Sequence, residues 1–454
     1  MMAAQILAIC IFVGMFLLII LDKFERYYIT LASGALVLVL VFGVCMHSMS
    51  AIWGTLNLPS IFTSGFWYGA SEEGNSGINW STIFFIAGMM IMVEGLGKAG
   101  FFRWLCLTLA KLVRYRIVPL LVCFMVLSAV LSMFIDSITV VLFLATVTLE
   151  LAQTMKFNPI PMILSEVFCA NLGGAATMCG DPPNIIVGTS LGYTFFDFIS
   201  NTGVAVAICF VLVLIYFVLC FRKRLLRDEK NSGAAVCPQP GTAITNRPAF
   251  LLSAGVFLLA VILLATHAQT KLTVACIGVI VAALSLVVIG CTSGGKAVLE
   301  IIKGVDYKTL LFFIGLFVSV AGLKETGVLD VIARFITTVS GGNAAIIVVI
   351  ILWISAVTSA FVDNIPFAAT MIPVVRSIAA ASGIDMGVLA WALSLGTDLG
   401  GNATPIGASA NVVGTSVAAK GGYPISWGVY CKYCVGATVL VIAVSMGYLF
   451  LRYL

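Results

Sequence analysis

Long apolar blocks separated by short polar segments run the whole length of this chain. Many of the blocks hold about 20 apolar residues, enough to cross roughly 30 Å of hydrocarbon as a helix. Two of them are interrupted by glycine and proline. The pattern predicts an all-α polytopic membrane protein with about ten transmembrane spans, at about 4–21, 28–49, 81–97, 161–190 (interrupted), 202–221, 249–266, 272–291, 309–323, 387–415 (interrupted) and 427–451.

Two further apolar stretches, about 117–155 and 344–381, are too long for one crossing and carry a polar tip in the middle. We interpret each as a re-entrant hairpin. The substantial hydrophilic segment of the chain, residues 222–248, divides it nearly in half. The sequence therefore predicts a first unit at 1–221, a linker at 222–248 and a second unit at 249–454.

The two units are related by an internal duplication. Sliding the chain against itself by 227 residues aligns about 79–184 with 306–411 without gaps. Chance matches between apolar segments would favour Leu, Val and Ile, whereas these matches are mostly Gly, Ser, Thr, Asp and Asn. The matched pairs include Gly88 with Gly315, Ser132 with Ser359, Asp136 with Asp363, Gly173 with Gly400, Thr177 with Thr404 and Asn184 with Asn411.

Each unit contains five crossings, so the second unit enters the membrane from the opposite side. Basic residues of cytoplasmic loops fix the orientation. The Arg222–Arg227 cluster places the linker in the cytoplasm and both termini outside, and residues 50–80, which contain no Lys or Arg, then lie outside. Lysines of the second unit follow the rule more weakly. Inverted repeats with interrupted spans are typical of secondary transporters.

Composition excludes several other classes. Hydrophobic residues make up 61% of the 454 residues and charged residues only 9%, which a soluble chain could not bury. The net charge of +5 comes from short loops between spans and gives no reason to expect nucleic acid as a partner. The 13 cysteines have no spacing that suggests disulfides or zinc, and the first apolar run is expected to be a retained span.

The hairpin tips carry the first candidate chemistry. Their sequences place Asp136 and Asp363 among apolar residues, and a carboxylate at membrane depth is costly unless it is paired, solvated or neutralised. Each aspartate is therefore a candidate for binding Na⁺ or exchanging H⁺. The alternative is that each one caps the second helix of its hairpin, and both roles can coexist.

The paired interruptions carry the second set of candidate functional groups. A glycine pair followed by glycine or proline cannot sustain a helix, and unwound backbone at this depth is tolerated where it lines a cavity. Its free carbonyl groups suit cations, and the N-terminus of the next half-helix suits an anion. Glu166, one turn before the first interruption, either faces the site or pairs locally. The candidate residues of the tips and interruptions are Asp136, Ser137, Thr139, Asn171, Gly173, Gly174, Thr177, Asp181, Asn184, Asp363, Asn364, Asp398, Gly400, Gly401, Asn402, Thr404, Ser409 and Asn411.

These segments resemble a known family. The strings SMFIDSITVV, ANLGGAATMCGDPPNIIVGTS, SAFVDNIPFAATMIPV and LGGNATPIGASANVVGTS are similar to those of the ion transporter superfamily, in particular its arsenite/antimonite permease and P protein branch, to which citrate, dicarboxylate and sodium/proton carriers are related. The resemblance covers nearly the whole chain. It implies a homodimer in which each protomer has a scaffold and a moving transport domain built from hairpins and broken spans.

The resemblance also bears on the substrate. Dicarboxylate carriers of the superfamily have a Ser-Asn-Thr motif at each tip, whereas here the tips read Asp136-Ser137-Ile138 and Asp363-Asn364-Ile365. Two carboxylates would repel an anion unless Na⁺ or H⁺ neutralises them. Asn171 and Asp398 occupy equivalent positions in the two units, as do Asp181 and Ala408, so the two ion sites are not expected to be equivalent.

The sequence thus predicts an ion-coupled secondary transporter in the cell membrane, with H⁺ or Na⁺ as the coupling ion, possible Na⁺ at Asp136 and Asp363, and no other cofactor. Its expected substrate is a small anion, an oxyanion or a neutral solute such as arsenous acid. A Na⁺/H⁺ antiporter is the alternative within transport. A channel or an intramembrane aspartyl protease fits the pattern less well, because duplication accounts for the two aspartates without catalysis.

Overall fold

The computed structural model describes residues 2–21, 23–69, 77–231 and 238–454, and helices dominate these residues. The helices of the first half are α1 (Met2–Leu21), α2 (Arg26–Leu36), α3 (Met49–Leu56), α4 (Ser64–Trp67), α5 (Trp80–Lys98), α6 (Phe101–Leu112), α7 (Ile117–Ser132), α8 (Ser137–Met155), α9 (Ile160–Gly174), α10 (Pro182–Leu191), α11 (Phe195–Phe198) and α12 (Val204–Asn231). Those of the second half are α13 (Arg247–Thr270), α14 (Val274–Ser293), α15 (Gly295–Gly304), α16 (Tyr307–Glu325), α17 (Val328–Val339), α18 (Ala344–Ser359), α19 (Asn364–Ser382), α20 (Met386–Gly400), α21 (Ser409–Lys420) and α22 (Trp427–Tyr453). Two segments are π-helical: Val37–Cys45 extends α2, and Ile199–Gly203 joins α11 to α12.

Ten helices of the described residues are long and apolar enough to cross a membrane. Eight of them coincide with spans expected from the sequence. The other two are α8 and α19, the second arms of the expected hairpins. The two interrupted spans are divided into short helices, α9 with α10 and α20 with α21, as their glycine and proline residues predict.

One group of helices forms a scaffold, consisting of α1, α2, α5, α13, α14 and α16. In this group α5 packs against α14, and α16 packs against α2. Both crossings are very close, because Gly88 of α5 faces the Gly278 backbone and Gly315 of α16 faces the Thr30 backbone. A Cβ built on Gly88 would lie 2.2 Å from the Gly278 oxygen, and one on Gly315 2.3 Å from the Thr30 carbonyl carbon. Each half therefore completes its scaffold with a helix of the other half.

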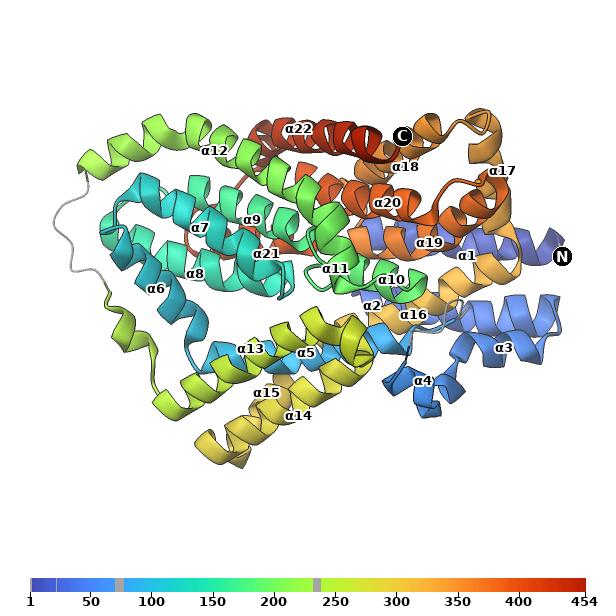
Figure 1. Ribbon diagram of the computed structural model, residues 1–454, viewed down its shortest axis with the longest axis horizontal. Helices are drawn as coiled ribbons and strands as arrows, with labels where there is room; N and C mark the ends of the chain where they lie inside the picture. Colours follow the sequence, from blue (N-terminus) through green and yellow to red (C-terminus); the bar gives the residue numbers. More distant parts are fainter. Residues whose placement is uncertain (1, 22, 70–76, 232–237) are drawn as a thin grey trace.

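The second group contains the two helix pairs α7–α8 and α18–α19, the broken helices and the long helices α12 and α22. We call it the hairpin body. Within it α7 packs against α9 and α18 against α20, while α10 contacts α19 and α21 contacts α8 across the halves. Figure 1 shows α6 and α17 at opposite ends of the molecule, where each leads from a scaffold helix to the first arm of a hairpin.

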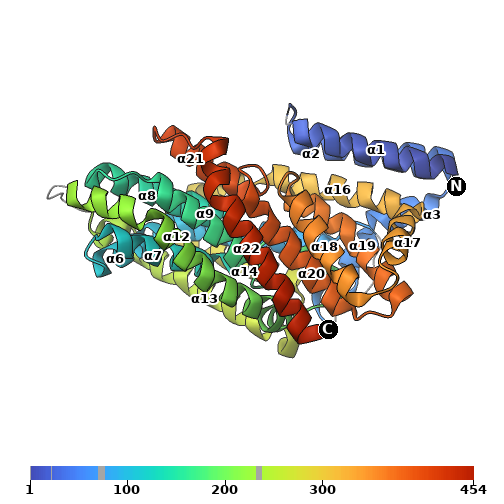
Figure 2. The same ribbon diagram turned by 90° about the horizontal axis from the view of Figure 1, so that it is seen from above.

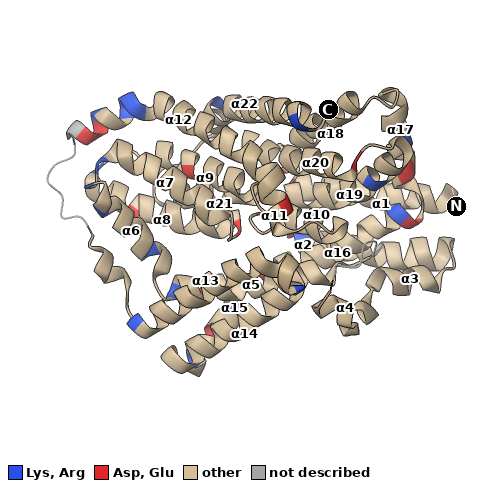
Figure 3. Cartoon of the chain, viewed as in Figure 1, with Lys and Arg blue, Asp and Glu red and all other residues tan. Residues whose placement is uncertain are grey.

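The ends of the helices carry most of the charge. Figure 3 shows charged residues at the far end of α12, around α6 and, at the opposite end, around α17, while the helices between are largely uncharged. The N-terminus lies at the end opposite the far end of α12 (Figure 1), and Figure 2 shows the scaffold helix α1 at the edge of the molecule, well away from α22.

The expected linker at 222–248 is only partly a loop. Helix α12 continues to Asn231, ten residues beyond the predicted end of the first unit, because residues 222–231 contain helix-forming Lys, Arg, Leu and Glu and no Gly or Pro. Residues 232–237 lie outside the described part of the chain. After them, the Tyr115 hydroxyl donates to the Pro238 carbonyl at 2.6 Å, which ties the linker to the turn before α7.

Candidate functional site

Both hairpin tips are closed by an aspartate that caps the second arm. Asp136 precedes α8, where its Oδ1 accepts the Thr139 amide at 2.9 Å and its Oδ2 accepts the Thr139 hydroxyl at 2.7 Å. Asp363 precedes α19 and accepts the Ile365 amide at 3.2 Å. The capping role considered from the sequence is therefore present at both tips, and it occupies lone pairs that a bound cation would otherwise use.

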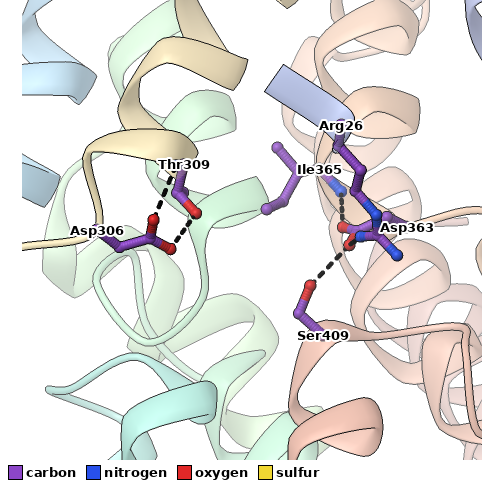
Figure 4. Close-up of polar contacts among 6 residues, drawn as sticks. All are labelled: Arg26, Asp306, Thr309, Asp363, Ile365 and Ser409. Atoms are coloured by element: carbon purple, nitrogen blue, oxygen red, sulfur yellow. Dashed lines mark hydrogen bonds and ion pairs between the residues drawn. The ribbon is translucent and has the colours of Figure 1, made fainter. Parts of the chain in front are cut away.

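Asp363 differs from Asp136 because it also forms an ion pair. Its Oδ2 lies 2.7 Å from Nη1 of Arg26 and accepts the Ser409 hydroxyl at 2.7 Å. Figure 4 shows Arg26 reaching Asp363 from α2, with Ser409 on the other side, whereas Asp306 nearby bonds only to Thr309, as a simple cap. The pair joins the scaffold to the hairpin body. Sequence reasoning missed Arg26, because a basic residue at the start of an apolar run is ordinary and its partner is 337 positions away.

Each helix break is closed by an asparagine of the half-helix that follows it. The Asn184 amide donates to the carbonyl oxygens of Gly174 and Thr177, both at 3.1 Å. In the second half, Asn411 donates to the carbonyl oxygens of Gly401 and Thr404, both at 2.8 Å. These bonds satisfy backbone oxygens that the break leaves without helical partners, so fewer carbonyl groups remain free for a cation than the sequence suggests.

The threonines of the breaks face the hairpin tips. Thr177 donates its hydroxyl to the Met133 carbonyl, and Thr404 donates to the Ala360 carbonyl. The two threonines therefore fasten each break to its own tip, while Asn184 and Asn411 close the breaks themselves. That these four side chains add ligands to a bound solute stays a prediction.

The two glycines of each pair have different structural roles. A Cβ at Gly173 or Gly400, the first of each pair, would lie 2.1 Å from the Ala129 oxygen or 2.3 Å from the Ala356 Cα, so these glycines allow α9 and α20 to approach the first hairpin arms. A Cβ at Gly174 or Gly401 would instead meet a carbonyl oxygen of its own break at 3.1 Å. Close packing explains the first glycine of each pair, and the turn of the break explains the second.

The two breaks meet at the centre of the hairpin body. Asn171 of α9 donates its amide to Oδ1 of Asn402 at 2.9 Å and to Oδ1 of Asn411 at 2.8 Å. The Ser394 hydroxyl of α20 donates to Oδ1 of Asn184. Each half therefore bonds directly to the break of the other half, and all these side chains are buried.

A similar link crosses at the hairpin tips. Asp181, just before α10, accepts the Asn364 amide at 3.1 Å from the opposite tip and the Ser137 hydroxyl at 3.4 Å from its own tip. The carboxyl group of Asp181 lies in the field of both Asp136 and Asp363. The structure thus gathers three acidic groups near the tips, with Arg26 as the basic partner of one of them.

Two buried acids remain incompletely bonded. Asp398 of α20 is fully buried and neither of its oxygens has a hydrogen-bond partner among the described residues. Glu166 of α9 accepts the Thr148 hydroxyl on Oε1 at 2.5 Å, while its Oε2 has no such partner. Of the two readings of Glu166, local pairing is the one that the structure supports.

A cavity of about 850 Å³ lies between the scaffold and the hairpin body. The scaffold contributes α5, α16 and the turn between α13 and α14, and the hairpin body contributes α10 and α19. The cavity reaches Met178 in the first break. Its lining includes the charged residues Lys271, Lys324, Arg376, Glu325 and Asp330, and His267. Lys324 is near enough to Arg376 to be affected by its charge.

Comparison with known proteins gives a consistent picture. The citrate transporter family profile matches residues 16–396. An uncharacterized transporter of Mycobacterium tuberculosis is 33% identical over 451 residues, covering 99% of both chains. The P protein of Mus musculus is 28% identical, and the match covers 82% of this chain and 54% of that protein.

Among solved structures, the YdaH transporter of Alcanivorax borkumensis shares the fold with a TM-score of 0.55 at 16% identity, over 81% of this chain and 84% of that one. The ten helices that are long and apolar enough to cross a membrane and the family match agree that this is a multi-pass membrane transporter. The chain belongs to the citrate transporter family.

Proposed function

We propose that this protein is an ion-coupled secondary transporter that carries a small anion by alternating access. The observation that supports it best is the cavity of about 850 Å³, which separates the scaffold from the hairpin body and ends at a helix break. In such a mechanism the hairpin body moves against the scaffold, and the cavity closes on one side as another opens on the other.

The architecture we propose is a pair of inverted-topology repeats, each with a re-entrant hairpin and a broken helix. Equivalent helices are offset by 227 residues, as for α5 and α16 or α7 and α18, and their contacts are reciprocal across the halves. With the linker in the cytoplasm, the segment before α5 and the turn between α13 and α14 lie outside. The cavity then opens to the outside, so this conformation is outward-facing. The homodimer stays a prediction of the resemblance.

Charge supports an anion as the substrate. Three basic residues line the cavity, Lys271, Lys324 and Arg376, against two acidic ones. The objection that two tip carboxylates repel an anion loses much of its force, because Arg26 pairs with Asp363 at 2.7 Å. A Na⁺/H⁺ antiporter remains the second candidate, favoured by the buried and incompletely bonded Asp398.

Flux into proteoliposomes tests the proposal. Citrate, succinate, arsenite and Na⁺ would each be measured with and without a pH gradient and a Na⁺ gradient. We expect accumulation of at least one of the carboxylates when an ion gradient is imposed. Flux of Na⁺ alone, driven by the pH gradient, would identify an antiporter instead, and equilibration without accumulation would identify a channel.

Lys324 gives a sharper test of the substrate charge. Lys324→Gln removes one positive charge from the cavity and should raise the KM for a carboxylate several-fold while leaving the amount of folded protein unchanged. Lys296→Gln is the matched control, because Lys296 lies in α15, does not line the cavity and is exposed. Equal KM values in both variants and the wild type would argue against a role for this cavity in anion binding.

A further inference from the structure

Asp398 is the one acidic side chain of the described residues that is fully buried with both carboxyl oxygens lacking a hydrogen-bond partner. An ionised carboxylate in such a place would cost several kcal/mol, because no donor of the described residues bonds to it. A partner for it must be sought in the surrounding side chains. The pseudosymmetry of the chain shows which one.

The equivalent residue of the first half is Asn171, 227 positions earlier. Asn171 has two amide hydrogens and uses both, one on Oδ1 of Asn411 and one on Oδ1 of Asn402. Around Asp398, the 227-residue offset replaces Asn411 by Asn184 and Asn402 by Ala175. Ala175 has no side-chain acceptor. The environment of Asp398 therefore offers one acceptor where that of Asn171 offers two.

Asn184 can only accept a hydrogen bond from Asp398. Both of its amide hydrogens are used on the carbonyl oxygens of Gly174 and Thr177. Its Oδ1 accepts the Ser394 hydroxyl and has a second lone pair. An ionised Asp398 has no hydrogen to offer to this oxygen, whereas a protonated Asp398 has one O–H for one available acceptor.

We propose that Asp398 carries a proton within the hairpin body and donates it in a hydrogen bond to Oδ1 of Asn184. This rests on the proposed function and deepens it, because it makes H⁺ the coupling ion. The carboxylate takes one proton from water that reaches the breaks and becomes a neutral acid. It returns the proton to water when the hairpin body exposes it on the other side.

Few other charges bear on this group. Asp181, just before α10, is held by the Asn364 amide and the Ser137 hydroxyl. The neighbouring helix α18 contains no titratable residue. The charged residues on the other helices against α20 have partners or lie at the surface. Glu166 bonds to Thr148, Arg376 donates to Ser190, Asp363 pairs with Arg26, Arg452 donates to the Ser200 carbonyl, and Lys432 is exposed. The titratable tyrosines and cysteines of α22 are neutral near physiological pH.

Infrared spectroscopy of the purified full-length protein tests the proton without depending on transport. A protonated carboxylic acid has a C=O stretching band that moves in D₂O. We expect one such band to disappear in Asp398→Asn and to remain in Glu166→Gln, which removes the other buried acid that is incompletely bonded. Retention of every such band in Asp398→Asn would overturn the proposal. Asp398→Asn is expected to fold, because Asn171 occupies the equivalent position.

A second variant keeps the carboxyl group itself. Ser394→Ala removes the competing donor to Asn184, so the bond from Asp398 should strengthen and its band should move to lower frequency. An unchanged band position would overturn the assignment of Asn184 as the partner. This variant serves as the test if Asp398→Asn does not accumulate.

Proteoliposomes connect the proton to transport. With citrate as the probe, a pH gradient should stimulate uptake by the wild type, and the ratio of uptake with and without the gradient should fall to one in Asp398→Asn. Stimulation by Na⁺ alone, together with no infrared band assigned to Asp398, would overturn the proposal while leaving an ion-coupled transporter. A band assigned to Asp398 without flux of any solute would instead count against the proposed function and support the proton site.

Discussion

The ion pair between Arg26 and Asp363 should act as a lock on the conformation described here. Arg26 belongs to the scaffold helix α2, and Asp363 belongs to the tip of the hairpin body, with Nη1 and Oδ2 2.7 Å apart. If the hairpin body moves against the scaffold, this pair must break. Arg26→Ala should therefore destabilise the outward-facing conformation relative to the inward-facing one, in which the pair is already absent.

The size of the effect follows from the burial of the two partners. The Asp363 side chain is 4% exposed and that of Arg26 33%, so the pair is stronger than one at the surface but weakened by water around the guanidinium group. We expect a loss of about 1–2 kcal/mol, which shifts the ratio of the two conformations roughly 5- to 30-fold. Asp363 retains its bonds to Ser409 and Ile365, so the protein should still fold.

Cysteine labelling measures this shift. Ala369 lines the cavity from α19, and Ala369→Cys in a background without native cysteines reports how often the cavity is open. Adding Arg26→Ala should slow maleimide labelling of the purified protein, because the rate follows the open fraction, and the slowing approaches the full shift of roughly 5- to 30-fold only where the open conformation is the minor one. The matched control is Lys308→Ala, which breaks the 2.7 Å pair with Glu25 between two parts of the scaffold and should leave the rate unchanged. An unchanged or faster rate with Arg26→Ala, in folded protein, would refute the lock.

The remaining predictions concern the tips, the breaks and the scaffold. Asp136→Asn and Asp363→Asn should each abolish ion-coupled flux in folded protein. Wild-type flux with unchanged pH and Na⁺ dependence would show that both aspartates act only as helix caps. Asp136→Ala should also lower the free energy of unfolding by about 1 kcal/mol, because it removes the cap. Gly173→Ala should prevent a monodisperse peak in size-exclusion chromatography, because its Cβ would lie 2.1 Å from the Ala129 oxygen. Gly174→Ala, in contrast, should fold and bind substrate more weakly. Normal apparent substrate affinity in both Gly174→Ala and Gly401→Ala would exclude the breaks from the binding site. Gly88→Ala should likewise lower the thermal midpoint by separating α5 from α14, and a midpoint equal to that of the wild type would show that the crossing can widen at no cost.

The sequence was informative wherever local chemistry decides the structure. The breaks follow from glycine pairs and proline, and the helix starts after Asp136 and Asp363 follow from residues that cap. Eight of the expected spans are continuous helices for the same reason, since apolar length alone determines them. Contacts between distant segments could not be read in this way.

Three distant contacts illustrate the limit. The pairing of Arg26 with Asp363 depends on how α2 packs against α16, which no periodicity reveals. The bond from Asn171 to Asn411 depends on the meeting of the two breaks in space. The role of Asn184 in closing its own break is local, but Asn is equally frequent in binding sites, so its sequence position does not distinguish the two uses.

The exchange of scaffold helices between the halves has a consequence for how the chain is made. The glycine face of α5 can pack only after α14 has been synthesised. Likewise α2 can pack only after α16, which ends at Glu325. More than half of the chain must leave the ribosome before either crossing can close. During that interval the membrane insertion machinery has to shelter helices that are already in the bilayer but not yet packed. A chain cut within 232–237 should thus be restored only when both pieces are synthesised together.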